Sequence, residues 1–429
     1  MNSKAFFIAS TLALFYSENI FAFDFVKEIL FSRGPPLTRV RRIEEQSARS
    51  TAERPVVLDT VGLVEKHGYP SEEHEVTTED GYNIKFFRIP GSPKSMVKRG
   101  KPVVFMQHGM FASSDSWVLL GPNRDLAFLL ADIGYDVWLG NVRGNSYGRS
   151  HVEVSPEEPE FWNFSFHEIA VWDLPKMIEH TLNYTDQKSL CYIGHSMGTT
   201  AGFILLAQRP EFNNKIHFFI ALAPVALWKR PPNPLVEAAT INGVGIKAFF
   251  DRHGIHELAP QSSQIVRIGR TFCDEKSATL PACARLFFLF GGEDPQQLNV
   301  TLLSHIVSYI PAGISTKTLF HFRQNIISGN FQHYDAGYIE NFKLYGKKKP
   351  PIYDLRRISV PIALIYGHND ALSREENTIE LARRLSNVVT IEAVPFRSFN
   401  HFDFLWAIDA KELLYDRVMT LIALFAVYR

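Results

Sequence analysis

Residues 191–202 read CYIGHSMGTTAG, and this stretch decides the fold, because an apolar run changes there into small, helix-compatible residues around a serine. Gly194 and Gly198 flank Ser196 in the pattern Gly-x-Ser-x-Gly. The pattern alone is weak evidence, since a serine between two glycines also occurs in ordinary turns. Its meaning depends on whether a strand precedes it and a helix follows it.

The chain around this stretch alternates between short apolar runs and longer helical ones. The apolar runs end at Gly, Pro, His, Asn or Ser and cover residues 101–109, 135–141, 190–196, 218–224 and 361–368. Helical patterns lie between several of these runs, at residues 125–134, 169–182 and 199–209. Strands that are apolar on both faces and separated by helices predict an α/β fold, with a mostly parallel sheet covered on both sides.

This context makes Ser196 a candidate nucleophile. In a strand–turn–helix arrangement, Gly194 and Gly198 remove side chains that would collide in a tight, strained turn. A serine hydroxyl also needs a base and an orienting carboxylate, which in this fold class follow in the order acid, then histidine. Asp370 follows the strand at 361–368, and His401 follows the next strand-like run, so we predict a Ser196, Asp370 and His401 triad.

An ester-cleaving site also needs backbone amides that stabilise an oxyanion. We expect one from Met197, directly after the nucleophile, and the other from Met110, in the loop after the early strand. The helix that starts after Ser196 points its positive dipole end at the same place. Because these donors belong to the main chain, either methionine side chain could vary without loss of the donor.

Length and composition bound the class of protein. The chain has 429 residues, of which 46% are hydrophobic, so it can bury a large core and exceeds one small domain. Forty-five basic residues balance forty-five acidic ones, which argues against a nucleic-acid partner. Neither the three cysteines nor the fifteen histidines have ligand spacing, so we expect no metal site and no cofactor.

The N-terminus predicts the secretory route. Lys4 precedes an apolar run of 12 residues, AFFIASTLALFY, which suits a signal peptide spanning residues 1–22. The alternative is an uncleaved anchor. No later stretch reaches the roughly 18 apolar residues of a membrane helix, so we expect the mature protein to be soluble, and secreted or lysosomal.

Residues 23–58 differ in composition from the rest. They are rich in Arg and Glu and have little apolar periodicity, which indicates a linker or pro-segment. Residues 39–42, RVRR, resemble a basic processing site, but short basic runs are common, so we expect a solvated run of charges and keep the processing site as the alternative.

Cysteines and glycan acceptors fit an oxidising compartment. Cys273 and Cys283 are ten positions apart in a polar segment, where a small closed loop would form, whereas Cys191 lies in the apolar strand and should be a buried free thiol. Asn163, Asn183 and Asn299 begin acceptor triplets for N-glycans. We expect Asn163 to be buried, because it lies among aromatic residues.

Several blocks resemble the animal acid lipase family, which includes gastric and lysosomal acid lipases. They run in family order from about residue 59 to the C-terminus and read HGMFASSDSWV, LAFLLADIGYDVWLGNVRGNSYGRSH, EFWNFSFHEIAVWDLP, GHSMGTT, ALAPVA, GNFQHYDAG and NHFDFLWAIDA. The resemblance implies an α/β-hydrolase core in two parts, residues 59–227 and 358–429. Between them, residues 228–357 are too long for a loop and would form a cap with a lid over a hydrophobic acyl-binding crevice.

The resemblance also assigns roles. Ser196, Asp370 and His401 match the family's triad, Met110 and Met197 its oxyanion amides, and Cys273 with Cys283 its disulfide. The chain departs from the family at Met197, where glutamine is usual, and at Arg374, where a second aspartate is frequent. The second departure removes a rival carboxylate and leaves Asp370 as the triad acid.

Three functions follow as hypotheses. The first is a lipase that hydrolyses triacylglycerols or sterol esters at a lipid–water interface through an acyl-enzyme, with peripheral contact to the lipid surface. The second is a soluble esterase of short acyl esters on the same fold. The third is a non-catalytic lipid-binding protein, which an intact triad disfavours. The sequence leaves open the preferred lipid, the pH optimum and the oligomeric state.

Overall fold

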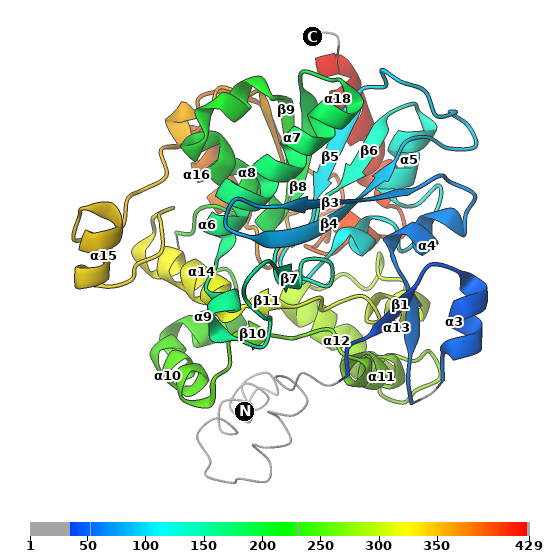
Figure 1. The fold of residues 1–429 in the computed structure, drawn as a ribbon, viewed down its shortest axis with the longest axis horizontal. Coiled ribbons are helices and arrows are strands. Elements are labelled where there is room, and N and C mark those ends of the chain that lie inside the picture. Colours follow the sequence, from blue (N-terminus) through cyan, green and yellow to red (C-terminus); the bar gives the residue numbers. More distant parts are fainter. Residues whose placement is uncertain (1–34, 52, 230, 427–429) are drawn as a thin grey trace.

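A computed structural model describes residues 35–51, 53–229 and 231–426, and Figure 1 shows its fold. A nine-stranded sheet lies at its centre. Its strands are, in spatial order, β13 (Val388–Ala393), β12 (Ile362–Tyr366), β9 (Ile216–Leu222), β8 (Leu190–His195), β5 (Val103–Gln107), β6 (Asp136–Leu139), β4 (Tyr82–Ile89) and β3 (Glu72–Thr77), with β7 (Ser150–His151) paired to β4. From β13 to β6 all pairs are parallel, which confirms the predicted sheet, whereas the β4 edge is antiparallel.

Both faces of the central strands are buried, as β5 illustrates. Val103 and Phe105 pack into one core with helices α7 (Leu174–Thr185) and α8 (Met197–Gln208). Val104 and Met106 point the other way, into a core with α4 (Thr60–Glu65), α5 (Leu126–Asp132) and α18 (Asp416–Ala426). This two-sided burial is the reason that the strand reads as a continuous apolar run.

Shorter elements complete this part of the chain. They are η1 (Ser114–Trp117), η2 (Pro159–Trp162), α6 (Phe166–Glu168), η3 (Ile169–Asp173), η4 (Pro210–Asn214), η6 (Leu355–Arg357), α16 (Glu375–Arg384), α17 (Asp403–Trp406) and η7 (Lys411–Tyr415). The elements α6, η3 and α7 follow one another without a break, and a capping box at Ser165 and Glu168 starts them.

A largely helical segment lies between β9 and β12 in the sequence and, in Figure 1, below the sheet. It contains α9 (Pro234–Ile241), α10 (Gly243–His253), β10 (Glu257–Leu258), α11 (Ser263–Phe272), α12 (Leu280–Gly291), η5 (Val300–Leu302), α13 (Leu303–Ile306), β11 (Ile314–Ser315), α14 (Thr316–Ser328) and α15 (Tyr338–Tyr345). Because β9 and β12 pair directly, the chain leaves the sheet and returns at neighbouring strands.

The region that we interpreted as a linker carries regular structure from residue 38 onward. Its elements are β1 (Thr38–Val40), α3 (Ile43–Arg49) and β2 (Val56–Leu58), and β1 pairs with β2 in parallel. The Arg39 side chain is only 13% exposed and contacts Asp115 (2.8 Å), Tyr147 (2.7 Å) and Gln261 (2.5 Å). The expectation of a solvated charge run is therefore wrong for Arg39, because a buried carboxylate binds it.

The predicted signal peptide, residues 1–22, lies outside the described residues. Within the described ranges, no helix combines the length and the apolar character needed to cross a membrane.

Candidate active site

Ser196 forms the turn between β8 and α8. Its backbone has φ 54° and ψ −119°, a conformation that is costly for a residue with a side chain. Its amide donates to the carbonyl of Leu222 (3.0 Å), and its carbonyl accepts from Thr199 Oγ1 (2.6 Å). Neighbouring groups therefore hold the strained turn and keep the hydroxyl at the carboxyl end of β8.

Close contacts explain why both flanking residues are glycines. A Cβ on Gly194 would lie 2.8 Å from the carbonyl carbon of Gly198, and a Cβ on Gly198 would lie 2.3 Å from the carbonyl oxygen of Gln107. Because Gln107 ends the neighbouring strand β5, Gly198 allows α8 to start directly against that strand.

The structure brings the three predicted side chains together. His401 Nε2 lies 2.9 Å from Ser196 Oγ, and His401 Nδ1 lies 2.8 Å from Asp370 Oδ2. A carboxylate only accepts hydrogen bonds, so Asp370 assigns the ring proton to Nδ1 and leaves the Nε2 lone pair facing the serine hydroxyl. This tautomer is the one that can take a proton from Ser196.

Backbone groups fix the acid and the histidine. Asp370 follows β12, and its Oδ1 accepts from the amides of Leu372 (2.8 Å) and Ser373 (2.7 Å). The imidazole lies closer to Oδ2, at 2.8 Å, than to Oδ1, at 3.1 Å. The amide of His401 donates to the carbonyl of Gly291 (3.0 Å), at the end of α12.

Two features of the structure bear on the expected oxyanion amides of Met197 and Met110. Met197 is the first residue of α8, where a helix leaves its amides without an intrahelical acceptor. Gly109 precedes Met110, and a Cβ there would lie 2.9 Å from Ser196 Cβ, so this loop runs directly over the serine. Phe111 has φ 62°, which makes the loop a second strained turn at the site.

A buried polar network that sequence reasoning missed supports this loop. His108 Nδ1 donates to the carbonyl of Gly109 (2.8 Å), so its Nε2 accepts from the side-chain amide of Asn145 (3.2 Å). Asn145 Nδ2 also donates to Asn141 Oδ1 (2.9 Å), which accepts the amide of Ser114 (2.9 Å). Burial lowers the pKa of His108 to about 4, so it stays neutral above that pH. Asparagines near turns are too common for the sequence to single these out.

A second group of buried residues lies next to the histidine. Burial raises the pKa of Asp403 to about 8, although the amide of Asn400 (2.7 Å) opposes the shift, and the carboxyl of Asp294 raises it further. Burial also raises the pKa of Asp294. Two adjacent carboxyl groups in a dry site retain a proton between them. Asp403 stands two residues after His401 in the sequence, which is the one signal that could have suggested it.

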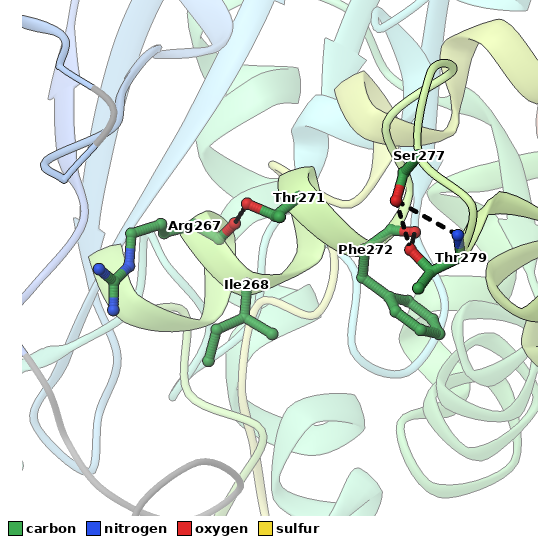
Figure 2. Close-up of a pocket in the computed structure, with 6 residues that line it drawn as sticks. All are labelled: Arg267, Ile268, Thr271, Phe272, Ser277 and Thr279. Carbon is green, nitrogen blue, oxygen red and sulfur yellow. Dashed lines mark hydrogen bonds between the residues drawn. The ribbon is translucent and has the colours of Figure 1, made fainter.

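The three side chains are covered. Ser196 is 9% exposed, Asp370 4% and His401 3%. A hollow of about 410 Å³ lies elsewhere, beside the Cys273–Cys283 loop. Figure 2 shows the residues that line it, which are Arg267, Ile268, Thr271, Phe272, Ser277 and Thr279. None of the three residues lines it, so this hollow is separate from the candidate site.

Other predicted positions have different outcomes. Cys273 and Cys283 form a disulfide, and Cys191 is a buried free cysteine. Asn163 is exposed, so the expectation that it is buried is wrong: its aromatic neighbours turn inward while its side chain accepts from Lys317 (3.0 Å). Asn183 is exposed and Asn299 half-buried. Among the described residues, no cluster of His, Cys, Asp or Glu could hold a metal ion.

Known proteins resemble this chain over most of its length. Residues 60–121 match the partial α/β-hydrolase lipase region, and residues 102–252 match the α/β-hydrolase fold family. Gastric triacylglycerol lipase of Mus musculus is 40% identical over 358 residues, which cover 83% of this chain and 89% of that protein. Lipase 3 of Drosophila melanogaster is 40% identical over 364 residues, covering 85% and 92%. Lipase member K of Homo sapiens is 37% identical over 363 residues, covering 84% and 89%.

Similarity to solved structures concerns the fold alone. A chain from Acinetobacter baumannii AYE has a TM-score of 0.50 at 14% identity and covers 86% of this chain and 96% of its own.

Proposed function

The chain belongs to the lipase family of the gastric triacylglycerol lipases, on the α/β-hydrolase fold, and we propose that Ser196, His401 and Asp370 carry out its hydrolysis of neutral lipid esters. The single observation that supports these roles best is the 2.9 Å contact between His401 Nε2 and the hydroxyl of a serine held in a strained turn. The chain is thus a serine ester hydrolase whose nucleophile is Ser196.

The first half of the reaction transfers the acyl group to the protein. Ser196 Oγ attacks the ester carbonyl while His401 Nε2 takes the hydroxyl proton. Asp370 stabilises the imidazolium through the 2.8 Å contact at Nδ1. The C–O bond of the ester then breaks, and His401 gives its proton to the departing alcohol, which leaves an acyl ester on Ser196.

The second half returns the serine. A water molecule gives a proton to His401 and attacks the acyl carbonyl, and the fatty acid leaves as Ser196 regains its proton. The amides of Met110 and Met197 stabilise the oxyanion in both halves, because main-chain donors held in place before the reaction need no reorganisation. No metal or cofactor takes part in these steps.

We assign residues 228–357 to a cap over the site and residues 59–227 and 358–429 to the catalytic core. Covered catalytic residues favour a substrate that meets the protein at a lipid surface, triacylglycerols or sterol esters, over a short dissolved ester. The disulfide and the predicted signal peptide support the secretory route, with a secreted or lysosomal destination. Exposed Asn163 and Asn183 are the glycan acceptors that we favour.

Replacing the nucleophile tests the assignment. Ser196→Ala should lower turnover of emulsified and soluble esters by about a millionfold and abolish labelling by a serine-reactive phosphonate. Ser189→Ala, just before the opposite end of the same strand, is the matched control and should keep full activity. Activity of Ser196→Ala within tenfold of the parent would refute the proposed nucleophile.

A further inference from the structure

A projection follows helix α14, and we define it as residues 334–350, which include α15. Its base is closed by backbone contacts: His333 donates to the carbonyl of Pro351 (2.9 Å), Tyr353 to that of Phe331 (2.9 Å), and Gln332 bridges to Ile352. Figure 1 shows α15, the helix of this projection, standing away from the body at the left edge.

The projection is held in one shape by its own side chains. Asn341 is buried, and its side-chain amide donates to Asp335 Oδ1 (2.7 Å) and to the carbonyl of Lys348 (3.1 Å). Its Oδ1 accepts the amide of Ala336 (2.9 Å), and Tyr345 donates its hydroxyl to the carbonyl of Tyr334 (2.9 Å). The residues that α15 exposes are therefore presented on a well-supported scaffold.

Apolar side chains gather on the outer face of α15. Tyr338 is 60% exposed, Ile339 67% and Phe342 60%. At about 100° of rotation per residue, these three positions fall within about 100° of one another around the helix. They form one apolar stripe, which is costly to leave in water.

Basic side chains follow this stripe in the sequence, and one of them lies against it. Residues 338–349 contain four lysines, at 343, 347, 348 and 349, and a single glutamate, although the whole chain has equal numbers of acidic and basic residues. Lys348 Nζ lies 5.3 Å from the centre of the Tyr338 ring, which places the lysine run beside the stripe. Glu340 is paired with Lys343 (2.6 Å) and so offsets one of the four charges.

We propose that the projection docks on an anionic lipid surface, with Tyr338, Ile339 and Phe342 inserted at the headgroup boundary and the lysines against the headgroups. Apolar residues next to lysines have the chemistry of interfacial anchors. The inference rests on the proposed function, because hydrolysis of lipid esters is what brings the protein to a lipid surface. It adds a binding surface separate from the catalytic residues.

The same features disfavour a second copy of the chain as the occupant. Two copies joined through this stripe would bring two lysine runs together, and like charges repel. Three side chains also present much less area than the roughly 800 Å² per partner of a stable protein interface.

Vesicle flotation tests the proposal with full-length protein carrying Ser196→Ala, so that no lipid is cleaved. The vesicles are phosphatidylcholine with or without phosphatidylserine. The double variant Ile339→Gln/Phe342→Gln should bind the phosphatidylserine vesicles at least tenfold more weakly. The triple variant Lys347→Gln/Lys348→Gln/Lys349→Gln should lose about fivefold in affinity for the phosphatidylserine vesicles per lysine at low salt. Its binding should then approach that of the parent to phosphatidylcholine alone.

Leu344→Gln is the matched control. Leu344 is 64% exposed on the same helix, about 160° of rotation away from Phe342, so its replacement should leave binding unchanged. Equal binding by the parent and both multiple variants, or an equal loss in the Leu344→Gln control, would overturn the proposal. Self-association of the parent without lipid that the double variant abolishes would assign the stripe to a second copy and also overturn it.

Failure of the proposed function has a different signature. With Ser196 intact, turnover of a short soluble ester should be unchanged in the double and triple variants while the rate on an anionic emulsion falls. Vesicle binding without any ester turnover would refute the catalytic assignment and leave docking standing. Turnover without vesicle binding would refute docking alone.

Discussion

Asn145 links the loop that carries Met110 to the interior of the protein. Its amide group bonds His108 Nε2 and Asn141 Oδ1, and its Oδ1 accepts the amide of Tyr147 (2.9 Å). A donor aimed at a developing charge is effective only if its position is fixed before the reaction. At the scale of one residue, the site therefore depends on a side chain that need not touch substrate.

Asn145→Ala should lower kcat on a soluble ester by about tenfold to a hundredfold with a smaller change in KM, because the loop loses its fixed position. Steady-state kinetics well below the unfolding temperature measures this split. Asn83→Ala, which removes an exposed amide bonded to Ser150, is the control and should be neutral. A rise in KM of about tenfold to a hundredfold with kcat unchanged would show that the network supports substrate binding rather than stabilisation of the oxyanion.

Asp403 gives stability a pH dependence of defined sign. Its pKa is about 8 in the folded protein and about 3.9 in an unfolded chain, so the folded state binds the proton more tightly. Stability from this group is present in acid and is lost as the pH rises towards 8. Asp403→Asn needs no proton, so its free energy of unfolding should gain on the order of 4 kcal/mol relative to the parent between about pH 5 and about pH 8.

Denaturant unfolding at each pH measures that difference. Burial lowers the pKa of His321 and His333 to about 3, so these two residues lower the free energy of unfolding of both proteins in acid. Variant and parent must therefore be compared at the same pH. Asp409→Asn, an exposed neighbour, serves as control. If the difference in free energy of unfolding between variant and parent does not change with pH, Asp403 does not hold the shared proton.

Residue types explain which parts of the site could be predicted. Ser196, Asp370 and His401 could be named because each follows a recognisable strand and their order is fixed by the fold. Asn145 could not, since its partners lie in other loops and only the folded chain brings them together. Arg39 was misjudged for the same reason: its buried partner Asp115 is 76 positions away.

Helix α12 connects the proposed cap to His401, the proposed base. Cys283 in α12 is joined to Cys273 at the end of α11, and the carbonyl of Gly291 at the other end of α12 accepts the amides of His401 and Ala371 (both 3.0 Å). A shift or local unfolding of α12 would therefore displace both the loop that carries His401 and the loop that carries Asp370.

Loss of the disulfide should act at this scale. Cys273→Ala/Cys283→Ala should lower the free energy of unfolding by about 2–3 kcal/mol, since the loop between the cysteines is short. It should also lower activity below the melting temperature, because α12 positions His401. Cys273→Ala alone should lose as much stability and activity as the double variant. Full stability and activity of the double variant would contradict the proposed link from the disulfide through α12 to His401.

Element prediction succeeded where burial is two-sided and failed at edges and projections. The runs at 101–109 and 190–196 could be read as strands because both faces are apolar. The antiparallel pairing of β4 could not be foreseen, since strand direction depends on chain connections elsewhere. The Lys347–Lys349 run was overlooked because three charges are unremarkable until the structure sets them beside exposed Tyr338.

At the scale of the whole molecule, the proposed cap contacts each of the three loops that we assign to catalysis. Ala312 donates to the carbonyl of Phe111 (2.8 Å) in the oxyanion loop, the side-chain amide of Asn233 donates to that of Ala371 (3.0 Å) after the acid, and Gly291 meets His401. Ser196, Asp370 and His401 are at most 9% exposed beneath these contacts. A long acyl chain can reach Ser196 only if part of this cover moves.

Opening the cover exposes apolar surface that water disfavours by about 25 cal/mol per Å², so the open state should be scarce in plain buffer. A lipid surface would cover the same area and shift the population towards the open form without any change in the triad. The rate on a long-chain ester should therefore rise steeply once the substrate passes its solubility limit. Asn233→Ala removes one closing contact, so it should raise the rate on dissolved long-chain ester and reduce the rise.

The control for this variant is Asn242→Ala, whose amide bonds the carbonyl of Ala238 (2.8 Å) within the cap and spans no boundary. A short soluble ester should be cleaved equally by all three proteins, because it needs no wide opening. A hyperbolic rate curve that ignores the solubility limit would instead favour the soluble esterase. It would mean that the cover, although closed over Ser196 in this structure, does not limit access, and that substrate reaches the serine by thermal motion of the loops alone.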